Sequence, residues 1–202
     1  MLKDKIKIAV FVSGGGTNLQ AILESEKRGE IVNGEISLVI SHNKNAYALE
    51  RAKNFGVKSV LIDKEVFKTI EEREQKMIEV LKENSIDLIV LAGYLSILSE
   101  NFTKLYANKI INVHPSLIPS FCGKGYYGLK VHEEALKYGV KVTGATVHFV
   151  NEIPDGGKII MQKAVEIKDG DTPEILQRRV MEQAEWIILP RAVEEVSKKL
   201  RG

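Results

Sequence analysis

The sequence predicts an α/β fold, an open and mostly parallel twisted sheet with helices on both faces and antiparallel strands added in the C-terminal part. Two short apolar runs, residues 6–12 and 86–93, have the uninterrupted hydrophobic character of parallel strands covered on both sides. Segments with helical periodicity separate such runs, as in folds that alternate strands and helices. Residues 141–150 instead alternate polar and apolar side chains, which is typical of an antiparallel strand.

The first half of the chain is interpreted as alternating strands and helices. After the strand at residues 6–12, a helical pattern from Leu19 to about Lys27 places Leu19, Ile22 and Leu23 on one face. The next predicted elements are a strand at 35–42, a helix at 46–55 ended by Gly56, a strand at 58–62, an amphipathic helix at 67–84, the strand at 86–93 and a short helix near 100–106.

The second half begins with a strand at 109–114, which ends in a loop because Pro115 and Pro119 exclude both helix and inner strand. A helix at 129–138 follows, and then a hairpin-like pair of strands at 141–150 and 158–167. The sequence Asp171-Thr172-Pro173-Glu174 is a favourable helix start. The last helix should run from there to Leu200, with Pro190 kinking or dividing it.

Composition narrows the class of protein. The 202 residues are ordinary for one α/β domain, and a net charge of +2, from 29 basic and 27 acidic residues, provides no overall field for nucleic acid or an anionic membrane. The single cysteine, Cys122, excludes an intramolecular disulfide and fits a reducing compartment. No apolar run approaches the length of a membrane span, and Met1–Lys5 shows no leader-like segment, so we expect a cytoplasmic protein.

A glycine-rich loop, Ser13-Gly14-Gly15-Gly16-Thr17-Asn18, joins the first strand to the first helix. Exposed backbone amides and the helix dipole make such a turn a natural anion site. A dinucleotide fingerprint would need glycine at position 19, where the chain has leucine, and a Walker loop would need Gly-Lys-Ser/Thr, where it has Gly-Thr-Asn. Binding of a nicotinamide dinucleotide or of a nucleoside triphosphate is therefore disfavoured. The loop therefore predicts a monophosphate site; the alternative is a plain turn with Thr17 or Asn18 as the helix cap.

Asn112 and His114 lie two residues apart on a predicted strand and so point to the same face. In a parallel sheet they project at the C-terminal edge, where open α/β folds bind ligands. An amide can donate a hydrogen bond to a developing oxyanion, and an imidazole can carry a proton near neutral pH. The pair suits acyl transfer, whereas the alternative is that both residues only end a strand and cap the next turn.

The run Asn112-Val113-His114-Pro115-Ser116-Leu117-Ile118-Pro119 resembles the signature of the folate-dependent formyltransferases. It is most similar to members that transfer the formyl group of 10-formyltetrahydrofolate to glycinamide ribonucleotide in purine biosynthesis. Residues 13–18 are similar to the phosphate loop of that family. The resemblance covers nearly the whole chain and implies small-molecule substrates, with no nucleic acid or membrane partner and no metal, in a monomer or homodimer.

The resemblance also implies roles for individual residues. Asn112, His114 and Asp155 would be catalytic, with Asp155 raising the pKa of His114 so that an imidazolium stabilises the oxyanion. The ribonucleotide phosphate would bind at Gly15, Gly16, Thr17 and Asn18. The folate site would draw on Arg73, Leu95, Ser96, Ile97, Leu98, Asn112 and Asn151.

Two stretches depart from the family pattern. Ser96 stands where an arginine is usual, which removes a cationic side chain from the predicted folate site. Residues 120–128 are longer than the common form, and their glycines and tyrosines suggest a mobile lid or, alternatively, a packed surface loop. Cys122 in this loop is interpreted as structural. His132 and His148 are more typical of structural histidines, with His148 the better second candidate for the site.

We expect a single domain over residues 1–202, in which about 1–108 bind phosphate and about 109–202 hold the catalytic residues and the C-terminal helix. Relatives that formylate a tRNA carry a further nucleic-acid-binding domain, and related deformylases carry a regulatory domain and a His-His-Ser strand end. A non-catalytic nucleotide-binding module is an alternative of another class. The four histidines and Cys122 show no close pair with the spacing of metal ligands.

Overall fold

A seven-stranded sheet forms the centre of the computed structural model, which describes residues 4–202 and so leaves Met1, Leu2 and Lys3 outside the described residues. The strand order is β3-β2-β1-β4-β5-β6-β7, and β1 to β5 run parallel while β6 and β7 are antiparallel to their neighbours. The strands are β1 (Ile6–Val12), β2 (Gly34–Ser41), β3 (Lys58–Leu61), β4 (Leu88–Leu91), β5 (Ile110–His114), β6 (Val142–Phe149) and β7 (Ile159–Glu166). The predicted fold class is confirmed.

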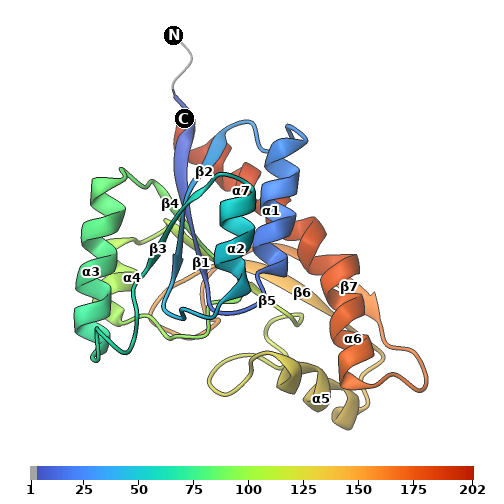
Figure 1. Cartoon of the computed structure of the whole chain (residues 1–202). Helices are drawn as coiled ribbons and strands as arrows, with labels where there is room; N and C mark the ends of the chain where they lie inside the picture. The colour runs from blue at the N-terminus through green and yellow to red at the C-terminus, as the bar shows by residue number, and fades with distance from the viewer. Residues whose placement is uncertain (1–3) are drawn as a thin grey trace.

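Helices cover both faces of the sheet (Figure 1). They are α1 (Thr17–Lys27), α2 (Tyr47–Asn54), α3 (Ile70–Glu83), α4 (Glu100–Leu105), α5 (Leu129–Tyr138), α6 (Pro173–Val180) and α7 (Trp186–Arg201), with a π-helix, Met181–Glu185, between the last two. Alternate residues of β1 show the two layers. Ile8 and Val10 pack in the core with α1, α2 and α7, whereas Ala9 and Phe11 pack in the core with α3 and α4. The uninterrupted apolar pattern of this strand follows from burial on both sides.

Two helices differ from the sequence prediction. The helix expected at 67–84 begins at Ile70, because Thr69 and Glu72 form a reciprocal capping box at its start. The helix expected to divide at Pro190 does so earlier, where the backbone widens into the π-helix at Met181–Glu185, and Pro190 lies inside α7. The start at Thr172 and Pro173 is as predicted, since the Thr172 side chain caps α6.

The strand order fixes where a ligand can bind. The chain leaves β1 toward β2 on one side, and β4 lies on the other side of β1, so the order reverses between these two strands. In open α/β sheets the crevice outside the carboxyl ends at such a point is the usual ligand site. The segments that follow β1, β4 and β5 all meet at this edge of the sheet.

Candidate active site

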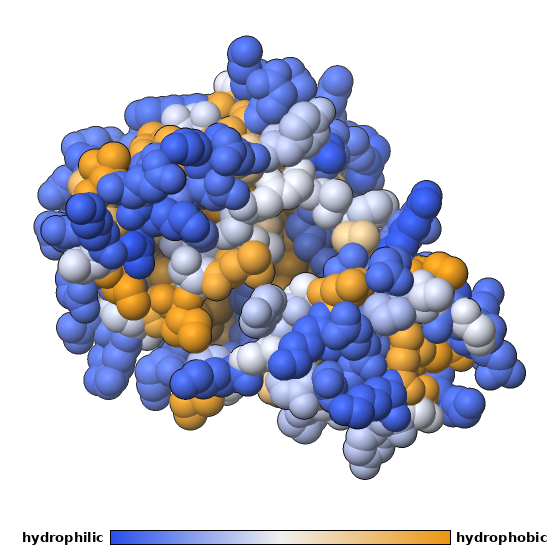
Figure 2. Space-filling model, turned by 60° about the horizontal axis from the view of Figure 1, so that its bottom comes forward, coloured by the Kyte–Doolittle hydropathy of each residue, from blue (hydrophilic) through white to orange (hydrophobic). Residues whose placement is uncertain are grey.

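A cavity of about 390 Å³ opens at this edge. Its walls come from the segment after β4, from Asn112 and His114 at the end of β5, from the loop of residues 123–128, from residues 150–155 and from the π-helix region. Figure 2 shows the hollow in this face of the molecule, with hydrophobic atoms along parts of its rim. A concave site with apolar walls and a few converging polar groups is the usual form of a small-molecule pocket.

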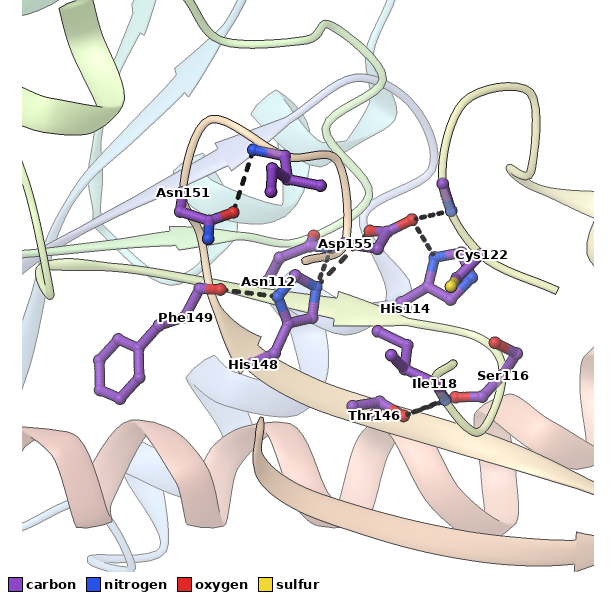
Figure 3. A network of polar contacts seen from close by, with 12 residues as sticks. Asn112, His114, Ser116, Ile118, Cys122, Thr146, His148, Phe149, Asn151 and Asp155 are labelled. Atoms are coloured by element: carbon purple, nitrogen blue, oxygen red, sulfur yellow. Dashed lines mark hydrogen bonds and ion pairs between the residues drawn. The ribbon is translucent and has the colours of Figure 1, made fainter. Parts of the chain in front are cut away.

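Asp155 lies between two histidines in this cavity (Figure 3). Its Oδ2 is 3.5 Å from Nδ1 of His114, and its Oδ1 is 3.6 Å from Nε2 of His148. The backbone N–H of Gly123 also donates to Oδ2, at 2.8 Å. Asp155 takes a positive φ of 57°, a conformation that residues with a side chain rarely adopt. The turn therefore places this carboxylate with a strained backbone. The structure thus brings Asp155 to Asn112 and His114, which precede it by 43 and 41 residues in the sequence.

Opposing effects act on the pKa of His114. Burial lowers its pKa, and this outweighs the opposite effects of the Asp155 carboxylate and of the Phe121 carbonyl. Nε2 of His114 donates to that carbonyl at 2.9 Å. Asp155 thus acts on the pKa of His114 in the predicted direction, but desolvation exceeds this effect, and the imidazolium stays a prediction. For Asp155 burial acts to raise the pKa, yet the two histidines and the Gly123 N–H together hold it below its ordinary value.

His148 fixes the orientation of the Asn112 amide. The two residues are paired across β5 and β6, and Nδ2 of Asn112 lies 3.2 Å from Nε2 of His148. Nδ1 of His148 is 2.7 Å from the carbonyl oxygen of Phe149, so Nδ1 carries the hydrogen and Nε2 is free to accept from the amide. One N–H of Asn112 is thereby fixed and the other remains for a ligand. Sequence reasoning held His148 as a second candidate; the cross-strand register gives it this role.

The glycine-rich loop leads into α1 at one end of the cavity. Gly16 is the N-cap, with a φ of 72° and no side-chain cap, so neither Thr17 nor Asn18 caps the helix. A Cβ at Gly16 would meet the side chain of Ala48 at 2.6 Å, so glycine is needed here for space as well as conformation. Asn18 lines the main cavity, whereas Thr17 lines a smaller neighbouring one and its hydroxyl approaches the sulfur of Met181 at 3.8 Å. The carbonyl of Gly15 accepts from Arg51 at 2.8 Å.

Glu185 is a cavity residue that the sequence analysis missed. It ends the π-helix, is buried, and its Oε2 accepts a hydrogen bond of 2.6 Å from Nδ2 of Asn18. Burial raises the pKa of Glu185 to about 7, against a smaller lowering effect of the Asn18 amide. A lone glutamate inside a helical pattern carries no signal of its own. Pro190, five residues later, indicated that the helix is irregular. It did not indicate that Glu185 would face the cavity.

The predicted folate segment also lines the cavity, and the Leu95 N–H donates to Ser13 Oγ at the start of the glycine-rich loop, at 2.9 Å. Leu95 and Ile97 are 64% exposed, Leu98 is buried, and Ser96 lies between them on the wall. Asn151 also lines the cavity, and its side-chain carbonyl accepts from the N–H of Ile153. The structure does not bring Arg73 to this wall. Its guanidinium donates to the carbonyls of Phe67 and Lys68 and so fastens the turn before α3.

The loop after the predicted signature contacts the cavity through Gly123, Lys124, Gly125, Tyr126, Tyr127 and Gly128. The ring of Phe121 packs beside those of Tyr126 and Tyr138, which attaches the loop to α5. Cys122 lies outside the cavity, donates to the Pro119 carbonyl at 3.3 Å and has its pKa raised by burial. A raised pKa keeps a thiol protonated and poorly nucleophilic.

Two features are absent from residues 4–202. No group of three or more His, Cys, Asp or Glu among them is arranged to hold a metal ion. No helix in this part of the chain has the length and apolar character needed to cross a membrane.

The sheet order and the site together define a class of α/β protein that binds its ligand in a crevice at the topological switch point of the sheet. In this chain an amide, two imidazoles and a carboxylate lie in that crevice. The sequence profile described as formyl transferase matches residues 6–193, and the chain belongs to that family. The family resemblance of the sequence is therefore confirmed.

The names of individual relatives are consistent with this family. The chain is 41% identical over 187 residues to the phosphoribosylglycinamide formyltransferase of Haemophilus influenzae, covering 93% of this chain and 85% of that protein. It is 43% identical over 194 residues to the trifunctional purine biosynthetic protein adenosine-3 of Gallus gallus, covering 96% of this chain but 19% of that protein. The chain thus spans about a fifth of the trifunctional animal relatives. The crystal structure of glycinamide ribonucleotide transformylase 1 from Symbiobacterium toebii matches with a TM-score of 0.90 and 39% identity, over 96% of this chain and 89% of that one.

Proposed function

We propose that this protein transfers the formyl group of 10-formyltetrahydrofolate to the amine of glycinamide ribonucleotide, giving the formylated ribonucleotide and tetrahydrofolate. One observation carries the proposal. A single cavity joins Asn18, beside the glycine loop, to the Asn112, His114 and Asp155 cluster and to the apolar segment of residues 95–98. A phosphate-bearing amine and a folate can then meet at the polar cluster.

The ribonucleotide would occupy the end formed by α1 and the π-helix. Gly15, Gly16 and Thr17 stand at the N-terminus of α1, where backbone N–H groups and the helix dipole favour a phosphate. Asn18 and the buried carboxyl of Glu185 lie next to this position. Both side chains offer hydrogen-bond partners for ribose hydroxyls. Hydrogen bonds from the ribose would offset the cost of burying the Glu185 carboxyl group.

The folate would lie along the wall formed by residues 95–98 and Asn151. Leu95 and Ile97 present exposed apolar side chains there, and Ser96, Leu98 and Asn151 complete the wall. The flat pterin ring is amphipathic, with an apolar face and polar edges, so backbone groups and Asn151 would bind its edge. Because Ser96 carries no charge and Arg73 is engaged elsewhere, neither supplies a cation to the folate tail.

The reaction needs an oxyanion partner and a proton carrier. The amine attacks the formyl carbon, and the free N–H of Asn112 donates to the oxygen that becomes negative, a contribution of about 3 kcal/mol for one such donor. The negative charge that develops on this oxygen raises the pKa of His114. The His114 ring and Asp155 together then take up the proton that the amine loses. They return it to the tetrahydrofolate nitrogen as the old C–N bond breaks. Proton transfer of this kind is worth about a hundredfold or more in rate.

Release of tetrahydrofolate tests the proposal. The purified protein and its His114→Ala variant are incubated with 10-formyltetrahydrofolate, with and without glycinamide ribonucleotide. Release that requires the ribonucleotide and falls about a hundredfold in the variant supports the transferase. Release without the ribonucleotide would indicate a hydrolase, and binding of the ribonucleotide without turnover would indicate a non-catalytic module.

A further inference from the structure

His132 is a cavity residue that the proposed reaction does not yet use. It lies on the first turn of α5 and is 0% exposed, yet it is among the residues that line the main cavity. Neither ring nitrogen has a hydrogen-bond partner among the described residues 4–202. A buried imidazole without partners is costly, unless its nitrogens serve a ligand in the cavity.

The other imidazoles of the site are already occupied. Nε2 of His114 donates to the Phe121 carbonyl, and Nδ1 of His114 faces Asp155 at 3.5 Å. Nδ1 of His148 donates to the Phe149 carbonyl, and Nε2 accepts from Asn112. In the proposed reaction His114 and Asp155 take up the proton that the amine loses, so none of these four nitrogens is left to hold the N–H that stays on the amine. The two nitrogens of His132 are free for that task.

The position of His132 points to the ribonucleotide and not to the folate. Helix α5 packs against α6, which runs directly into the π-helix that carries Glu185 (Figure 1). His132 also lies close enough to His114 for the charge of His114 to act on it. The ring therefore lines the same cavity as Glu185 and lies near His114. Burial, with a smaller effect of His114, lowers the pKa of His132 to about 4, so the ring is neutral and retains an acceptor nitrogen at neutral pH.

We propose that His132 holds the nucleophilic amine of the ribonucleotide by accepting a hydrogen bond from one of its N–H groups. The inference rests on the proposed function. During the reaction the amine nitrogen forms the new C–N bond and loses one proton to the His114 and Asp155 pair. The second N–H stays on the nitrogen, bonded to His132, and becomes the amide N–H of the product. His132 thereby directs the nitrogen lone pair at the formyl carbon and undergoes no net proton change.

The test compares two ligands in each protein. Glycinamide ribonucleotide has the amine, and acetamide ribonucleotide has a hydrogen in its place, so the ratio of their dissociation constants measures recognition of the amine alone. We expect this ratio to fall about fivefold in His132→Leu and His132→Phe, the worth of one neutral hydrogen bond. His132→Gln keeps an acceptor and should retain most of the ratio. Val131→Ala, a buried change next to His132 on α5, is the matched control and should leave the ratio unchanged.

The outcomes separate this inference from the function on which it rests. A merely structural role for His132 would weaken both ligands equally and leave the ratio as in the parent, which would overturn the inference. Because the ratio is taken within each variant, partial loss of folded protein does not change it. Failure of the parent protein to bind glycinamide ribonucleotide would instead overturn the proposed function.

Discussion

The side-chain amide of Asn112 lies 3.2 Å from Nε2 of His148, on the neighbouring antiparallel strand. Because that nitrogen accepts, one N–H of the amide is fixed on His148, and the other N–H, not the amide oxygen, is proposed to face the reacting centre. We expect Asn112→Ala to lower kcat about a hundredfold or more, the usual effect of losing one oxyanion donor. His148→Leu should lower kcat by a smaller factor with little change in the KM for the ribonucleotide. A His148→Leu enzyme with normal kcat would show that the amide needs no support.

The conformation of Gly16 gives a prediction about stability. Gly16→Ala should lower the free energy of unfolding by about 1–3 kcal/mol, because φ is positive there and the added Cβ meets Ala48. Gly14→Ala is the matched control, since its φ is not in the left-handed region and nothing lies within 4 Å of the added Cβ. Denaturant unfolding of the two variants measures the difference. Equal stabilities would mean that the loop can move away from α2 without cost.

Glu185 should make stability depend on pH. Its pKa is raised from 4.5 to about 7 in the folded protein, so the folded state binds this proton more tightly than the unfolded state. The contribution of Glu185 to the free energy of unfolding therefore falls as pH rises from about 4.5 to about 7 and is constant above that. Relative to the parent, Glu185→Gln should gain on the order of 3 kcal/mol over this range.

The comparison is made by denaturant unfolding of both proteins across that pH range. Glu182→Gln provides the control, because Glu182 is exposed on the same π-helix turn. The effect assigned to burial of Glu185 is the part of its pH slope that exceeds the slope of the Glu182→Gln comparison. Above pH 7 the Glu185→Gln protein should also bind glycinamide ribonucleotide more weakly, so greater stability and weaker binding would appear in one variant.

The exposed apolar side chains of the folate wall should matter for binding but not for folding. Leu95→Ser together with Ile97→Ser should raise the KM for 10-formyltetrahydrofolate about tenfold or more, because a bound ring would cover these side chains. Their 64% exposure means that the folded protein loses little packing. Leu105→Ser, at a similarly exposed leucine outside the cavity, should change neither KM nor thermal stability. An unchanged KM in the double variant would place the folate elsewhere.

The fold was predictable because its strands carry a local signal. β1 and β4 are apolar on both faces, and the alternation of β6 reflects its different, antiparallel position. Asn112 and His114 were predictable for the same reason, since a period of two places them on one face of β5. The meeting of Asp155 with these residues required the family resemblance, because a turn residue before two glycines carries no sign of its long-range partner.

Other features depend on distances and burial in the folded protein, which a sequence pattern does not contain. The pKa of His114 is decided by the balance between desolvation and the Asp155 charge, and only the folded geometry sets that balance. The position of Arg73 depends on which carbonyls the turn before α3 leaves within its reach. The burial of Glu185 follows from one widened helical turn, whose place relative to Pro190 cannot be read from periodicity.

The hydrogen bond between Asn18 and Glu185 joins residues 167 positions apart in the chain. The proposed ribonucleotide end of the cavity can therefore form only after both Asn18 and Glu185 have been synthesised. The parallel strands β1 to β5 can pair earlier during synthesis, but a nascent chain that stops before the π-helix lacks one wall of this pocket. A product that ends before Glu185 would therefore not compete for the ribonucleotide if the proposed site is the binding site.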